Sequence, residues 1–143
     1  MREKTLADIR VGQKASFTKT ITEADVVLYA GLTGDFNRVH VDEEYARGTR
    51  FGGRIAHGLL VAGLVQPALS ALTTPGGVSL HYEFDLKAPV RLGDTITAEA
   101  EVVDIRRDKP IVTLDTRCTN QRGEVVISGR ALIYMVSEKD RGA

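Results

Sequence analysis

The sequence predicts an α+β fold in which one antiparallel sheet wraps round a central, buried helix. Residues 55–72 place apolar side chains on nearly every side of a helix, a pattern typical of helices buried within a domain. From Val78 onward, apolar residues recur with the period of two that β-strands show. One helix followed by a run of strands is typical of the α+β class. A length of 143 residues suits one domain, which we expect to span residues 1–143.

The N-terminal region is expected to contribute one strand and one short helix. The strand covers residues 14–21, and Thr22 and Asp25 follow it at the spacing of a capping box. Apolar residues at helical spacing then continue to about Leu32, and Gly34 provides a stop.

Residues 37–54 contain several glycines and are expected to form a loop, with one turn of helix around residues 43–45. The central helix follows over residues 55–72. Pro67 lies inside it and cannot donate a hydrogen bond to the carbonyl of Gly63, so we expect a bend there.

The rest of the chain predicts four antiparallel strands, with hairpin turns at residues 107–110 and 121–123. Alternate residues of 96–102 would share one face of a strand, and so would alternate residues of 125–135. The four strands are expected over Val78–Val90, Thr95–Arg106, Ile111–Asn120 and Glu124–Val136.

Composition excludes several classes of protein. The 19 basic residues equal the 19 acidic residues, so there is no excess of positive charge for nucleic acid or an anionic membrane. The N-terminus lacks the apolar segment of a signal peptide, and the apolar run after Arg54 is too interrupted to span a bilayer. We therefore expect a soluble, cytoplasmic protein. Cys118 is the only cysteine, which leaves no internal disulfide and favours a role as a small core residue.

The strongest chemical signal is the segment GDFNRVH, which places Asp35 and His40 five positions apart in a turn after the first helix. Histidine exchanges protons near neutral pH, and a carboxyl group does so where burial raises its pKa. A loop folded over an apolar helix would provide that burial, so both residues are candidate general acid–base groups. Taken alone, such a pair more often marks a turn cap and a packed surface histidine. Asn37 lies between them and is expected to bond its own backbone and to position the turn.

Gly58 is the second candidate, at the start of the central helix. The first N–H groups of a helix have no intrahelical acceptor, and the helix dipole favours negative charge there. Because glycine has no Cβ, a carbonyl oxygen can approach its N–H closely. An enolate or a tetrahedral oxyanion on a thioester would be stabilised at such a place. The alternative is that Gly58 only allows the helix to pack closely on the sheet.

No metal site is expected, because His40, His57 and His81 have no helical ligand spacing and the chain has no H-E-x-x-H motif. Nucleotide-binding glycine motifs and the serine-hydrolase elbow are also missing from the sequence. Three basic residues are candidates for a phosphate contact, although exposed basic side chains more often have no ligand: Arg50, Arg54 and Lys87.

The segment GDFNRVHVDEEYA, residues 34–46, resembles the hydratase signature of the MaoC-like, (R)-specific enoyl-CoA hydratases. The segment FGGRIAHG, residues 51–58, looks like that family's lead into its central helix, and the likeness extends to residues 108–114. One departure lies inside the signature. Arg38 stands where the family usually has Pro, which removes a rigid residue from the loop and would let Arg38 reach an interface or a phosphate.

The resemblance implies a hot-dog fold, with the antiparallel sheet wrapped round the central helix, and homodimers, or dimers of dimers, whose sheets join near the substrate tunnel. It also implies syn addition of water to a short- or medium-chain trans-2-enoyl-CoA, giving the (R)-3-hydroxyacyl-CoA. In that reading Asp35 and His40 are catalytic, Asn37 is the motif asparagine, and the Gly58 N–H binds the thioester carbonyl. No cofactor is expected, since coenzyme A is part of the substrate.

Two alternatives remain open from the sequence. A hot-dog acyl-CoA thioesterase shares the fold, which does not fix the function, but such enzymes typically lack the signature histidine. A non-catalytic acyl-CoA-binding module is the other alternative, and the presence of both Asp35 and His40 argues against it.

Overall fold

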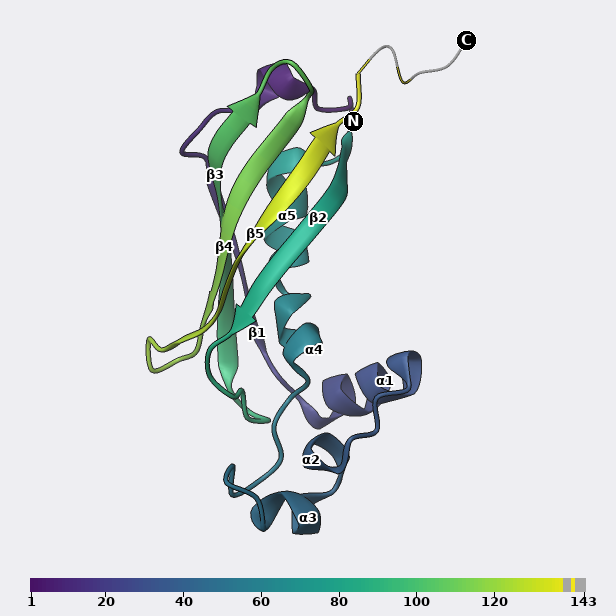
Figure 1. Ribbon diagram of the computed structural model, residues 1–143, viewed down its shortest axis with the longest axis vertical. Coiled ribbons are helices and arrows are strands. Elements are labelled where there is room, and N and C mark those ends of the chain that lie inside the picture. The colour runs from purple at the N-terminus through teal and green to yellow at the C-terminus, as the bar shows by residue number, and fades with distance from the viewer. Residues whose placement is uncertain (138–139, 141–143) are drawn as a thin grey trace.

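The computed structural model describes residues 1–137 and Asp140, and it has the predicted α+β architecture (Figure 1). Its strands form one antiparallel sheet in the order β1-β3-β4-β5-β2, so that β1 and β2 are the two edges. The strands are β1 (Lys14–Thr20), β2 (Gly77–Leu86), β3 (Thr95–Arg106), β4 (Ile111–Thr119) and β5 (Val125–Met135).

Every predicted strand is present, and only β2 differs clearly in length. It ends at Leu86 rather than at Val90. The N–H groups of Lys87 and Ala88 both donate to the carbonyl of Val126, and this shared acceptor ends the regular ladder. Pro89 then has no N–H with which to continue it.

The single central helix that we predicted is two helices, α4 (Gly58–Ala62) and α5 (Val65–Thr73), and the expected bend at Pro67 is wrong. The chain breaks one turn earlier, at Gly63 and Leu64. Pro67 is instead the third residue of α5. The backbone N–H groups in the first turn of a helix have no intrahelical acceptor, so a proline, which lacks the N–H, fits there without strain.

The prediction that this region is buried on all sides is also wrong for the single chain. The helix α5 buries one face against the sheet, through Val65, Ala68, Leu69 and Thr73. Its opposite face stays exposed, as does Leu59 of α4, which is 65% exposed. One sheet covers only one side of a helix. The apolar pattern of residues 55–72 therefore predicted more buried side chains than a single copy of the chain has.

Three helices gather at one end of the sheet (Figure 1). The first, α1 (Glu23–Thr33), begins with both hydrogen bonds of the predicted capping box and ends at Gly34 in the left-handed conformation, with φ of 81°. Within the predicted loop over residues 37–54, the expected turn of helix is present as α3 (Glu43–Arg47), and a second short helix, α2 (Arg38–Val41), was not predicted. Helices of this length are too short to show a hydrophobic period, which is why α2 escaped the sequence analysis. A 3₁₀ turn at Leu6–Asp8 precedes β1.

The core lies between the sheet and the helices α4 and α5. The predicted β3 face is fully buried at Ile96, Ala98, Ala100 and Val102. Cys118 is buried as expected, and burial raises the pKa of its thiol to about 11. None of the helices in the described part of the chain has the length and apolar character needed to cross a membrane.

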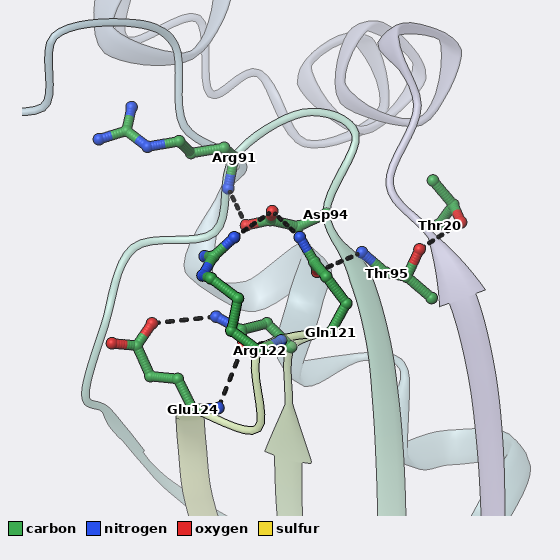
Figure 2. A network of polar contacts seen from close by, with 8 residues as sticks. Thr20, Arg91, Asp94, Thr95, Gln121, Arg122 and Glu124 are labelled. Carbon is green, nitrogen blue, oxygen red and sulfur yellow. Dashed lines mark hydrogen bonds and ion pairs between the residues drawn. The ribbon is translucent and has the colours of Figure 1, made fainter.

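A buried carboxylate joins the turn before β3 to the hairpin between β4 and β5 (Figure 2). Asp94 is 5% exposed and accepts hydrogen bonds from the N–H of Arg91 at 2.9 Å and from Gln121 Nε2 at 2.8 Å. Arg122 lies 3.5 Å from the same carboxylate. Burial alone raises the pKa of Asp94, but these donors and the charge of Arg122 outweigh it and hold the pKa below its usual value.

Replacement of Asp94 by Asn is expected to lower the free energy of unfolding at pH 7 by about 1–3 kcal/mol, because one of the two donors then faces an NH₂ group. A lowered pKa in the folded state stabilises the fold above the unfolded pKa of about 3.9, and this contribution is lost as the pH falls through the folded pKa. The gap between wild type and Asp94→Asn should therefore shrink near pH 3. Urea unfolding at pH 7 and pH 3 measures it, and an equal gap at both would contradict the argument.

Candidate active site

The structure brings Asp35 and His40 together, as the sequence predicts. Asp35 follows the left-handed Gly34, and its Oδ1 accepts a hydrogen bond from the N–H of Asn37 at 3.2 Å. His40 lies on α2, and its Nε2 is 4.0 Å from Asp35 Oδ2. This separation is too long for a direct hydrogen bond, but it leaves both atoms within reach of one shared water.

The hydrogen bond to Ile55 determines which nitrogen of His40 is available. His40 Nδ1 lies 2.8 Å from the carbonyl oxygen of Ile55. A carbonyl oxygen only accepts, so in the neutral ring Nδ1 carries the proton and Nε2 presents its lone pair near Asp35. The ring is held in place, since its side chain is only 11% exposed.

The burial that we expected for Asp35 is not present in the single chain, where its side chain is 51% exposed. The loop 37–54 was expected to cover it, but α2 and α3 extend beyond the end of the sheet (Figure 1). Asn37 does bond its own backbone, as predicted: it caps α2, and its Oδ1 accepts from the N–H of Val39 at 3.3 Å.

Gly58 is the first residue of α4 and shares a cleft of about 390 Å³ with His40. A Cβ built at Gly58 would lie 2.5 Å from Leu86 Cδ1, so the position is closed to a side chain unless Leu86 moves. Apolar side chains line most of the cleft, among them Val61, Leu86 and Ile127. The cleft thus combines an apolar wall, a helix N-terminus and an imidazole, an arrangement that suits an acyl thioester.

The sequence analysis missed the role of His57 in this arrangement. His57 is 2% exposed, and its ring stacks on that of His40 with centroids 3.9 Å apart and an interplanar angle of 29°. Its Nε2 lies 2.9 Å from the carbonyl oxygen of Asp35. The available signal was its place directly before the candidate Gly58, whereas we weighed it only as a metal ligand together with His81, which is exposed on β2.

Asp35, His40 and His57 each offer one potential ligand atom, and these atoms lie within 4.8 Å of one another. The lone pairs of an imidazole lie in the plane of its ring, so two stacked rings direct them within two separate, nearly parallel planes rather than towards one point between the rings. A tetrahedral zinc site needs converging ligands. The group therefore fits a metal ion poorly.

Of the three basic residues that were candidates for a phosphate contact, Arg54 makes contacts within the fold instead. Its side chain is 12% exposed, donates to the carbonyl of His40 at 2.6 Å and pairs with Glu23 at 2.6 Å. Arg50 and Lys87 do line the cleft that holds Gly58.

Arg38, where the family resemblance led us to expect proline, contacts residues at the junction of α2 and α3. It pairs with Asp42 at 3.0 Å, and its guanidinium lies 4.5 Å from the centre of the Tyr45 ring. In the single chain it therefore reaches neither the cleft nor the site formed by Asp35 and His40.

A model of the MaoC-like domain family matches residues 7–121, which include Asp35, Asn37, His40, His57 and Gly58. The chain belongs to the MaoC-like domain family. Two of its relatives are (R)-specific enoyl-CoA hydratases. That of Rhodospirillum rubrum is 46% identical over 90% of this chain and 89% of the relative, and that of Aeromonas caviae is 40% identical over 89% and 96%.

The solved structure of the R-hydratase PhaJ1 from Pseudomonas aeruginosa, in its unliganded form, has the same MaoC-like fold. It superposes with a TM-score of 0.85 at 38% identity, covering 94% of this chain and 86% of that chain. The hot-dog fold implied by the sequence is therefore confirmed, with α4 and α5 as the central helices.

Proposed function

We propose that this chain is an (R)-specific enoyl-CoA hydratase, which reversibly adds water to a trans-2-enoyl-CoA to give the (R)-3-hydroxyacyl-CoA. One observation carries the proposal: Asp35 and the lone-pair nitrogen of His40 lie 4.0 Å apart, and His40 shares an apolar cleft with the N-terminus of α4. Relatives up to 46% identical over most of the chain bear this function in their names. We also propose that the addition is syn and that the enzyme prefers short to medium acyl chains.

In the proposed reaction, Asp35 and His40 hold one water between them. Its oxygen bonds to the β-carbon, its proton passes to one of the two side chains, and a proton is delivered to the α-carbon from the same side. The C=C π bond breaks, and the elements of water are all that is added. The Gly58 N–H binds the thioester oxygen, where negative charge develops in the transition state, and Asn37 keeps the turn in shape. The thioester itself makes the α-proton acidic, so the proposal requires no cofactor.

Crotonyl-CoA is the first substrate to test. We expect loss of the conjugated-thioester absorbance, formation of (R)-3-hydroxybutyryl-CoA, and no release of the free thiol of coenzyme A. Release of thiol would instead indicate a thioesterase, and tight binding of acyl-CoA without turnover across short and medium chains would indicate a binding module. Assay of crotonyl groups carried by an acyl carrier protein would show which carrier the cleft accepts.

We also propose that two copies of the chain form a homodimer through β2. This edge strand exposes Val78, Leu80, Tyr82 and Leu86, each at least 39% exposed. Apolar edges of this kind pair readily with another strand, whereas lysines protect an edge, as Lys14 and Lys19 do on β1. A dimer would also cover part of the exposed face of α4 and α5.

The variant Leu80→Lys is therefore expected to weaken dimerisation by about tenfold or more, because it places a charge in an apolar interface. Analytical ultracentrifugation over a range of concentrations measures the dissociation constant. Val11→Lys is the matched control, since Val11 is 63% exposed and Leu80 57%, but Val11 lies before β1. Equal effects of the two variants, or a wild-type monomer, would overturn the proposed interface.

A further inference from the structure

His57 is a buried polar side chain that the proposed reaction does not use. It is 2% exposed, and in the described part of the chain its Nδ1 has no hydrogen-bond partner. An unpaired buried nitrogen costs stability, and an apolar aromatic ring of similar size would avoid that cost. The unpaired Nδ1 thus gives no reason for an imidazole at this position, and the reason is to be sought in the contacts of Nε2 and of the ring.

The polar contact that His57 does make is with the backbone of a proposed catalytic residue. Its Nε2 lies 2.9 Å from the carbonyl oxygen of Asp35, and because that oxygen only accepts, Nε2 carries the proton and donates. The donor thus fixes the peptide from which the Asp35 side chain projects, at the point where the chain leaves the left-handed Gly34.

The ring of His57 also supports the second proposed catalytic residue. It lies against the ring of His40 at 3.9 Å between centroids, while the ring of Tyr29 packs on it at 4.7 Å. With Nδ1 of His40 bonded to Ile55, the stack leaves the His40 ring little freedom to tilt.

His57 is the N-cap residue of α4, so it is joined by one peptide bond to Gly58. One buried side chain therefore links the backbone of Asp35, the ring of His40 and the helix start that bears the Gly58 N–H. Asp35 and His40 lie on either side of the start of α2, whereas Gly58 begins α4, so His57 joins two parts of the site that are distant in the sequence.

We propose that His57 is a positioning residue, which holds Asp35 and His40 in place relative to the Gly58 N–H. This inference rests on the hydratase function proposed above. Since a misplacement of about 1 Å can cost about 100-fold in rate, loss of the Nε2–H donor should act on kcat rather than on substrate binding.

Two substitutions separate the hydrogen bond from the ring. His57→Phe keeps a ring against His40 but removes the donor, whereas His57→Gln can place an amide N–H where Nε2 now lies. With crotonyl-CoA, we expect His57→Phe to lower kcat by about 10- to 100-fold with KM changed by less than about threefold. His57→Gln should recover kcat to within about fivefold of wild type. Val112→Ala, a buried β4 position away from the cleft, controls for lost stability and should melt at a lower temperature with kcat unchanged.

A wild-type kcat in His57→Phe would overturn the inference, and so would an equal loss in His57→Gln and His57→Phe, because the donor would then not matter. A comparable loss of kcat in Val112→Ala would also overturn it, since lost stability would then account for the effect. If the wild-type protein does not hydrate crotonyl-CoA or any longer enoyl-CoA, the proposed hydratase function is wrong. The wild-type assay therefore distinguishes a wrong function from a wrong role for His57.

Discussion

Asp35→Asn and His40→Asn are each expected to lower kcat for hydration of crotonyl-CoA by about 10²- to 10⁴-fold, the usual contribution of a general acid–base group. Asn at position 35 keeps the shape of the side chain but cannot take up a proton. Asn at position 40 can still donate to the carbonyl of Ile55 from near the place of Nδ1, yet it lacks the Nε2 lone pair. Each change thus removes the chemistry while keeping the principal local hydrogen bond.

The double variant is expected to be little worse than the more impaired single one. Both side chains act on one water, so losing either already abolishes the shared step, and effects of groups that act as a unit are not additive. Initial rates of absorbance loss, with single-turnover measurements for slow variants, give the comparison. Asp104→Asn is the matched control, since Asp104 is an exposed carboxylate on β3. Near-wild-type kcat in Asp35→Asn or His40→Asn would remove that residue from the mechanism.

The strands could be predicted because the sheet has one buried face. Ile96, Ala98, Ala100 and Val102 alternate with polar neighbours, and that period of two specifies both the strand and its inner side. The alternation did not identify the buried side chain at the start of β5, where the register shifts opposite Cys118 and Thr119 and Val126 is buried instead of Val125. An extra residue in one strand reverses the order of inward and outward side chains, and the sequence pattern did not locate it.

The helices were harder to predict because their ends depend on local backbone chemistry and on neighbours. The break at Gly63 leaves the apolar pattern of residues 55–72 uninterrupted, so the pattern reads as one helix. The site shows the same limit. Asp35, His40 and Gly58 were found from motif and spacing, but the contact of His57 with Asp35 joins positions 22 apart and depends on how α1 and α4 meet.

Gly58→Pro is expected to lower kcat by about 10²- to 10³-fold, the cost of losing one donor to a developing oxyanion. Proline suits the backbone at this position, although its Cβ requires Leu86 to move. Gly58 is the first residue of α4, where proline is favoured and no intrahelical bond is lost. His57 before it has φ of −59° and ψ of 134°, the extended conformation that a residue before proline adopts. The substitution therefore removes an N–H and leaves the backbone path allowed.

Gly58→Ala is the matched control, because it keeps the N–H but adds the same Cβ. That Cβ meets only the Cδ1, Cδ2 and Cγ atoms of Leu86, whose side chain ends a strand and is 60% exposed, so Leu86 can move aside. We expect Gly58→Ala to lose less than about tenfold in kcat. The ratio of the kcat values of Gly58→Ala and Gly58→Pro then measures the contribution of the N–H to catalysis. Both should bind a saturated acyl-CoA, measured by calorimetry, since a donor to the developing oxyanion acts mainly in the transition state. If Gly58→Ala and Gly58→Pro were equally impaired, the space beside Leu86 and not the N–H would account for the glycine.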